Sequence, residues 1–213
     1  MTTQNHDIYQ LALHDKAMMP VFAYGSAGTG KTYGAMERAV QWLEEGRKQK
    51  IVMIRPNVAF ADTLGFLPGD AKEKLEPWIK PFRENLAAHG IGISHQQNLE
   101  ARGVITYLPL EHCQGLTFDN TFICVDECEN MTFEQIKMVL TRVGKWSKIV
   151  FCGDVAQTSP KFKKSGLKEY IEMIEYFDAP MHTIEFTRDD IVRSDLCRQV
   201  IIMHEEWQKL GNS

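Results

Sequence analysis

Short apolar runs alternate along the chain with segments whose apolar residues recur at helical spacing. Runs of four or five apolar residues between polar stretches are typical of buried strands. They occur at 20–24, 51–54, 104–108, 121–125 and 149–152. Over 33–45, by contrast, Met36, Ala39 and Leu43 fall on one face of a helix. This alternation predicts an α/β fold with a mostly parallel sheet and helices on both faces.

Two later segments also have a helical pattern. Apolar residues recur at helical spacing over 133–140, and Thr132 and Gln135 form a capping box at its start. A final amphipathic helix is predicted at about 195–209.

The segment from about 63 to 103 breaks the alternation. It contains three prolines, the aromatic residues Trp78 and Phe82, and the polar stretch 94–98. Prolines interrupt regular elements, and polar stretches between them favour surface positions. We predict an insertion of short helices and a surface loop, within a single domain that spans residues 1–213.

The composition is that of an ordinary globular protein, with 44% hydrophobic and 24% charged residues. No apolar run approaches the roughly 18 residues of a membrane-spanning helix, and the first ten residues are mostly polar, unlike a secretory signal. We therefore expect a cytoplasmic protein without a membrane partner. The five cysteines show no C-x-x-C spacing, so they predict buried thiols rather than a zinc site.

One glycine-rich segment lies between a predicted strand and a predicted helix. It consists of Gly25, Ser26, Ala27, Gly28, Thr29, Gly30, Lys31 and Thr32. Such a segment forms a phosphate-binding loop (P-loop), because glycines let backbone N–H groups approach phosphates and the helix N-terminus favours an anion. We expect Lys31 to contact the β- and γ-phosphates and Thr32 to bind Mg²⁺. The alternative is a glycine-rich turn that only caps a helix.

Two acids, Asp126 and Glu127, directly follow the apolar run 121–125. Hydrolysis of a nucleoside triphosphate with Mg²⁺ needs an acid at the end of a neighbouring buried strand. We predict that Asp126 holds Mg²⁺ through water and that Glu127 polarises the attacking water. The alternative is a strand that ends in two solvated acids. A small-molecule kinase is less favoured, since it has little need of the second acid.

The stretch 153–157 reads Gly-Asp-Val-Ala-Gln and follows another apolar run. It places polar side chains at the carboxyl edge of the predicted sheet, where open α/β sheets bind ligands. Gln157 is predicted to contact the γ-phosphate or the attacking water. Glycine and aspartate are also common in ordinary turns, which is the alternative.

With these motifs, the chain resembles the PhoH family of P-loop ATPases, which is related to superfamily 1 helicases. The resemblance covers about residues 5–193. It rests most strongly on 64–70 (Leu-Gly-Phe-Leu-Pro-Gly-Asp), which has no general structural reason to recur. Besides the phosphate loop and the two acids, the matches are Arg55-Pro56, Glu73-Lys74, Pro77, Thr117-Phe118, Asn130, 140–144, Gly153-Asp154, Gln157 and 190–193.

The resemblance implies a RecA-like P-loop NTPase core that hydrolyses ATP with Mg²⁺. It also implies a homo-oligomeric ring, with a hexamer as the expected form, and RNA or DNA as the partner. In such a ring one subunit offers an arginine to the nucleotide of its neighbour. Arg193 is the first candidate, followed by Arg142 and Arg188. Each of them could equally be a surface residue or an ion-pair partner.

The sequence departs from the family pattern in three places, one of which is Gln114, where the family often has an arginine before Gly115. His6 stands where the family has a glutamine that reads the adenine edge, so His6 is predicted to contact the base. Tyr9 is predicted either to stack on the base or to face the core. Cys128 and Glu129 replace the usual alanine and glutamine after the two acids, which adds negative charge near the site.

Two groups of lysines with an aromatic residue lie in the last third of the chain. They are Lys145 and Lys148 with Trp146, and Lys161, Lys163, Lys164 and Lys168 with Phe162. Lysines and aromatic rings can bind a nucleic-acid strand, but lysine clusters are also common on solvated surfaces. The net charge of −4 gives no overall support for nucleic-acid binding.

These observations predict a ring-forming, Mg²⁺-dependent ATPase that acts on RNA or DNA as a helicase or translocase. The alternative is a nucleotide-gated switch that hydrolyses ATP and binds partners without unwinding nucleic acid. A nuclease is disfavoured, because that chemistry needs a cluster of metal-binding acids and those present are already assigned to the nucleotide.

Overall fold

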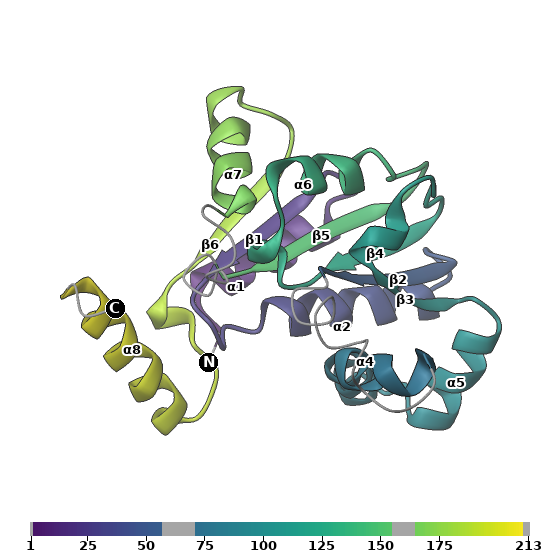
Figure 1. The fold of residues 1–213 in the computed structure, drawn as a ribbon, viewed down its shortest axis with the longest axis horizontal. Helices are drawn as coiled ribbons and strands as arrows, with labels where there is room; N and C mark the ends of the chain where they lie inside the picture. The colour runs from purple at the N-terminus through teal and green to yellow at the C-terminus, as the bar shows by residue number, and fades with distance from the viewer. Residues whose placement is uncertain (1, 57–70, 155–164, 211–213) are drawn as a thin grey trace.

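Six parallel strands form one sheet in the order β3-β2-β4-β5-β1-β6, in a computed structural model that describes residues 2–56, 71–154 and 165–210 (Figure 1). The strands are β1 Val21–Gly25, β2 Lys50–Arg55, β3 Ile105–Pro109, β4 Thr121–Val125, β5 Lys148–Gly153 and β6 His182–Phe186. All neighbouring strands pair in parallel. The first five confirm the predicted apolar runs to within one residue at each end.

The sixth strand, β6, has no continuous apolar run, so the sequence does not predict it. It lies at the edge of the sheet beside β1. Ile184 and Phe186 are buried, whereas Glu185 between them is exposed. The alternation is typical of a half-buried strand, but five residues of it are a weak signal in sequence.

Helices cover both faces of the sheet, as predicted (Figure 1). They are α1 Gln4–His14, α2 Lys31–Glu44, α4 Ala71–Ala88, α5 Ile93–Ala101, α6 Phe133–Leu140, α7 Gly166–Tyr176 and α8 Asp195–Lys209, with short 3₁₀ helices η1 Leu110–Cys113, η2 Cys128–Asn130 and η4 Arg188–Asp190. Val21 of β1 shares one core with Trp42 of α2. Phe22 shares the other core with Tyr170 of α7. Both sides of the central strands are therefore buried, which explains their continuous apolar runs.

The predicted insertion differs from its expected form. The segment contains one short helix, α5 with nine residues, but α4 runs for 18 residues and contains Pro77 and Pro81. Trp78, Phe82 and Leu86 on one face of α4 are buried, so packing outweighs the two backbone hydrogen bonds that the prolines remove. The polar stretch 94–98 is likewise part of α5 rather than a surface loop, with Gln96 buried in it. The segment 63–70 lies outside the described residues.

The C-terminal helix α8 occupies the predicted range and lies at one end of the molecule, away from the sheet (Figure 1). The capping box of α6 is also present: the Thr132 side chain accepts from the Gln135 N–H, and the Gln135 side chain accepts from the Thr132 N–H. Over the described ranges of the chain, we find no helix whose length and apolar character would let it span a bilayer.

Candidate nucleotide site

The segment after β1 forms a tight loop that ends at the start of α2. An added Cβ at Gly25 would lie 2.0 Å from the carbonyl oxygen of Phe186, so a larger residue there requires β6 to move. Gly30 is the N-cap of α2 and has a left-handed conformation, with φ of 80° and ψ of 18°. The free N–H groups of the first turn of α2 therefore face the loop, as a phosphate-binding loop requires.

A cavity of about 540 Å³ opens over this loop. Residues 28–33 line it, together with Asn85, Val192 and Arg193. A cavity of this volume is in the range of small-molecule sites. Asn85 belongs to α4, so the insertion reaches the site, which no sequence motif indicated.

The Lys31 side chain lies in the loop itself. Its Nζ atom donates hydrogen bonds to the carbonyl oxygens of Gly25 (2.8 Å) and Ser26 (2.7 Å) and to the Thr29 hydroxyl (3.2 Å). Burial lowers the pKa of Lys31, and the nearby Asp154 carboxylate opposes that shift. A buried ammonium group whose partners here are neutral loop oxygens is a strong attractor for an incoming phosphate.

The phosphate loop contacts β4 through Thr32 and Asp126. The Thr32 hydroxyl donates a hydrogen bond of 2.7 Å to Asp126 Oδ1, and Arg55 Nη2 donates one of 2.5 Å to Asp126 Oδ2. The Asp126 N–H continues the sheet ladder by donating to the Ile54 carbonyl at 2.9 Å, which fixes the acid at the carboxyl end of β4. The sheet order thus brings together two motifs that are far apart in the sequence.

Thr32 and Asp126 fit the predicted magnesium ion chemically. A hydroxyl and a carboxylate are hard oxygen ligands, which Mg²⁺ prefers. Across the part of the chain that the structure describes, no three His, Cys, Asp or Glu side chains form a metal cluster. At Mg²⁺ sites of nucleotide-binding proteins, substrate phosphates and water commonly supply the remaining ligands.

Glu127 adopts a left-handed backbone conformation, with φ of 53° and ψ of 37°, which is uncommon for a residue with a side chain. Its side chain is 45% exposed, and its Oε1 atom lies 3.6 Å from Arg55 Nη2. Burial raises the pKa of Glu127, Arg55 lowers it and Asp126 raises it, so that it ends above its usual value. An acid with a strained backbone and a raised pKa is a common feature of functional sites.

Arg55 also belongs to the site, although the sequence does not assign it there. The Arg55-Pro56 pair indicates only the end of a strand and a match to the family. The contact with Asp126 arises because β2 lies beside β4, although the described elements α4, α5, β3 and η1 lie between them in the sequence. Burial lowers the pKa of Arg55, but Asp126 and Glu127 raise it by more.

Glu129 connects the ends of β4 and β5. Its side chain is buried, and its Oε2 atom accepts a hydrogen bond of 3.0 Å from the Asp154 N–H. A Cβ added to Gly153 would lie 2.8 Å from the same oxygen, so the glycine makes room for the carboxyl group. Burial raises the pKa of Glu129 to about 7. The negative charge expected from the sequence is therefore only partly present at neutral pH.

The sequence matches the family model of the PhoH-like protein over residues 1–205. This chain belongs to the PhoH-like protein family. It is 42% identical over 188 residues to the PhoH-like protein of Bacillus subtilis (strain 168), and 33% identical over 196 residues to Protein PhoH of Escherichia coli (strain K12). The alignments cover 87% and 91% of this chain but 58% and 54% of those relatives, so the chain spans little more than half of their length.

Solved structures with the same fold include the large terminase from a thermophilic bacteriophage. One crystal form of that terminase aligns with a TM-score of 0.56 and 13% sequence identity, covering 92% of this chain and 48% of the terminase. A form in complex with ADP gives a TM-score of 0.55 and 14% identity, over 94% and 49% of the two chains. At such low identity the likeness concerns the fold alone, and it confirms the expected RecA-like P-loop NTPase core.

In the PhoH-like chain, His6 and Tyr9 support the phosphate loop from α1. His6 Nδ1 accepts from the Thr3 N–H at 3.2 Å, so Nε2 carries the proton and donates to the Thr29 carbonyl at 2.9 Å. Both ring nitrogens are thus engaged within the chain. Tyr9 is 2% exposed and donates to the Lys31 carbonyl at 2.8 Å. Stacking of Tyr9 on a base is therefore wrong, because the ring is buried in the core.

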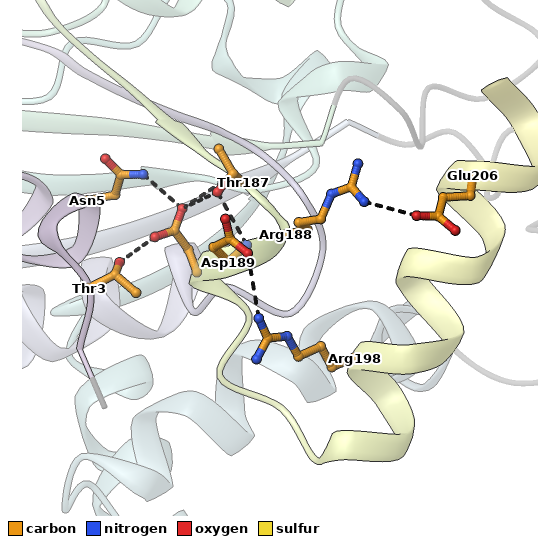
Figure 2. A network of polar contacts seen from close by, with 8 residues as sticks. Thr3, Asn5, Thr187, Arg188, Asp189, Arg198 and Glu206 are labelled. Carbon is orange, nitrogen blue, oxygen red and sulfur yellow. Dashed lines mark hydrogen bonds and ion pairs between the residues drawn. The ribbon is translucent and has the colours of Figure 1, made fainter.

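The three candidate arginines lie in different places. Arg193 lines the cavity and packs against Gly28 of its own loop. Arg188 forms an ion pair of 3.2 Å with Glu206 of α8 (Figure 2). The Arg142 carbonyl accepts a hydrogen bond from the Phe118 N–H, just before the start of β4. Arg142 therefore lies at the amino edge of the sheet, opposite the phosphate loop.

The segment that carries Arg193 is tied to both ends of the described chain. Asp190 accepts hydrogen bonds from the Thr3 hydroxyl and, at 2.8 Å, from Asn5 Nδ2. Figure 2 shows Thr3 and Asn5 beside Thr187, and Arg198 of α8 directed at Asp189. These contacts hold residues 187–193 next to the phosphate loop.

The other residues predicted from the sequence have different outcomes in the structure. Gln157 and Lys161, Lys163 and Lys164 lie outside the described residues. Lys148 is fully buried and donates to the Ala12 and Met19 carbonyls, so its predicted place in a basic surface group is wrong. Trp146 is 73% exposed. Cys124 and Cys152 are buried, as predicted.

Proposed function

We propose that this chain is a Mg²⁺-dependent ATPase of the PhoH type. The observation that carries the proposal is the hydrogen bond between Thr32 and Asp126, with Glu127 beside them at the same edge of the sheet. A loop that only caps a helix has no use for two acids at that position. The ADP bound to the phage terminase of the same fold is consistent with a nucleotide in this cavity.

Each residue has a defined part in the proposed reaction. Lys31 exchanges its loop oxygens for the β- and γ-phosphate oxygens, and the N–H groups at the start of α2 bind the same phosphates. Thr32 and Asp126 would hold Mg²⁺, which neutralises charge on the phosphates when bound. Glu127 orients the attacking water and accepts its proton. We assign contact with the γ-phosphate or with this water to Gln157.

The first test is steady-state ATP hydrolysis by Lys31→Ala and Glu127→Gln. We expect each variant to lose about a hundredfold or more in kcat, since each removes a group that acts on the transferred phosphate or the water. Glu127→Gln should keep its affinity for ATP, because it retains the loop. Glu134→Gln, an exposed change on α6, serves as the matched control. A Glu127→Gln variant as fast as the control would remove Glu127 from the mechanism.

We also propose that the chain acts as a homo-oligomeric ring, a hexamer, on RNA or DNA. The position of Arg142 at the edge opposite the phosphate loop supports a role on a neighbouring subunit's nucleotide. The relationship of the family to superfamily 1 helicases and the exposed Trp146 beside Lys145 support a nucleic-acid partner.

Single-stranded RNA and DNA, added separately to the hydrolysis assay, test this part of the proposal. We expect at least one of them to raise the wild-type rate, and Trp146→Ala to reduce the stimulation without changing the unstimulated rate. If hydrolysis is measurable but no strand changes it, the nucleotide-gated switch becomes the better assignment.

A further inference from the structure

Arg55 stands between the two acids of the site and an aromatic ring of α4. On one side its Nη2 atom lies 2.5 Å from Asp126 Oδ2 and 3.6 Å from Glu127 Oε1. On the other side, the guanidinium carbon lies 5.1 Å from the centre of the Phe82 ring. The side chain is only 12% exposed. Arg55 is therefore held by the acids at the edge of its guanidinium group and by the ring at its face.

The Phe82 ring has a fixed position. It is fully buried, and its centre lies 6.0 Å from the Trp78 ring and 6.3 Å from the Tyr107 ring of β3. A cation over a buried aromatic face is attracted to it more strongly than in water. The ring thus provides a rigid support, belonging to α4, on which the arginine lies.

The guanidinium gives up a hydrogen bond in this position. Among the described residues, the buried Nε atom of Arg55 has no hydrogen-bond partner. An unpaired buried donor is unfavourable, so the contacts with Phe82 and the acids outweigh it. The two adjacent carboxylates repel each other, and a cation placed against both offsets that repulsion.

We propose that Arg55 is a positioning residue for Asp126 and Glu127 and that Phe82 holds it in place, so that α4 acts on hydrolysis through a contact that does not touch the nucleotide. This inference rests on the ATPase activity proposed above. It gives the insertion a role at the site: α4 sets the orientation of the two acids from outside the cavity.

The geometry explains why other residues would serve less well. Lysine keeps the charge of Arg55 but lacks the planar group that contacts a ring on its face and two carboxylates at its edge. Leucine in place of Phe82 keeps an apolar side chain of similar size but removes the aromatic face. Both changes should disturb the acids without removing a group that contacts ATP.

The test compares Arg55→Lys, Phe82→Leu and the double variant with Arg83→Lys. Arg83 is a matched control, because it is also largely buried, pairs with Glu100 at 3.0 Å and lies over the Tyr107 ring, away from the acids. The measurements are kcat and KM for ATP, the affinity for ADP by calorimetry, and unfolding in urea.

We expect Arg55→Lys to lower kcat at least tenfold and Phe82→Leu three- to tenfold, while KM and ADP affinity change less than threefold. The double variant should be no slower than Arg55→Lys, since both changes act through one contact. Arg83→Lys should keep kcat while losing comparable stability. If Arg55→Lys and Arg83→Lys have equal kcat, or if the loss of kcat in the double variant is the product of the two single losses, this inference is wrong. The proposed ATPase function would not be affected by either result. A wild-type protein that hydrolyses no ATP would overturn both this inference and the proposed function.

Discussion

Glu129 carries less charge at neutral pH than its position in the sequence suggests. The resemblance to the family leads one to expect glutamine there, and the extra carboxyl group suggests added negative charge. In the structure the carboxyl group is buried, accepts from the Asp154 N–H and has a pKa raised by burial to about 7. The residue therefore links the ends of two strands and keeps its proton at pH values where an exposed glutamate is ionised.

The burial of this carboxyl group makes stability depend on pH. The folded chain keeps the Glu129 proton up to about pH 7, whereas the unfolded chain releases it near pH 4.5. The folded state thus binds more protons between these values, so the stabilisation is fully present below pH 4.5 and is lost as pH rises through about 7. Glu129→Gln lacks this titration. In urea unfolding, its stability relative to wild type should rise from near zero at pH 4.5 to roughly 3 kcal/mol at pH 8.

A difference between Glu129→Gln and wild type that stays constant from pH 4.5 to 8 would contradict this prediction. Glu134→Gln again provides the control, because its exposed side chain should leave the pH dependence unchanged.

The residues that sequence reasoning finds are those whose roles are encoded locally. The phosphate loop, Asp126 and Glu127 each follow an apolar run, so their chemistry can be read from neighbouring positions. Arg55 cannot be found in this way, because its partners lie on β4 and the sequence does not state that β2 is the neighbour of β4. For Tyr9 the sequence allows two roles, and only the packing of α1 decides in favour of the core.

The strands buried on both faces are predictable from the sequence, and so is the edge strand β3, whereas β6 and the full length of α4 are not. The central strands have continuous apolar runs because helices cover both faces. The edge strand β6 and the proline-containing α4 depend on tertiary packing that overrides weak or contrary local signals. The sequence places α8 correctly, but it does not reveal how loosely this helix is attached.

Helix α8 presents apolar side chains to solvent along much of its length. Leu196, Met203 and Trp207 are 72%, 61% and 59% exposed. The ion pairs that join α8 to residues 188–189 are partly exposed, and such pairs contribute little stability. We therefore expect α8 to open locally without global unfolding.

Hydrogen exchange measured by mass spectrometry checks this expectation. Backbone amides of α8 should exchange on the order of a hundredfold faster than those of α2, whose buried face is part of the core. If α8 proves as protected as α2, its apolar face must be covered in solution, for example by a second chain.

At the scale of the whole molecule, the candidate groups divide between two edges of the sheet. The phosphate loop, the two acids and Arg193 lie at the carboxyl edge, whereas Arg142 lies near the amino edge. Since all strands run in parallel, roughly the length of a five-residue strand, about 17 Å, separates the two edges. Arg142 is thus poorly placed for a nucleotide on its own phosphate loop, and better placed for the nucleotide of a neighbouring chain in the proposed ring.

Mixing two inactive variants tests this division. Arg142→Ala and Lys31→Ala should each hydrolyse ATP slowly alone. In an equal mixture within the proposed ring, an intact loop would meet an intact arginine at about a quarter of head-to-tail interfaces. Hydrolysis should therefore recover to about a quarter of the wild-type rate. Arg193→Ala mixed with Lys31→Ala should show no recovery, because Arg193 lies against its own loop. If hydrolysis recovers only in the second mixture, Arg193 rather than Arg142 acts on the nucleotide of the neighbouring chain.

The left-handed backbone at Glu127 also bears on how the protein can be engineered. Glycine adopts that conformation freely, so Glu127→Gly should relieve a strain of about 1 kcal/mol. A directed-evolution screen that rewards only thermal resistance would therefore enrich glycine at this position. The selected variants would be more stable proteins that bind nucleotide but no longer hydrolyse ATP. A screen for thermal stability would therefore need to be combined with an assay of ATP hydrolysis.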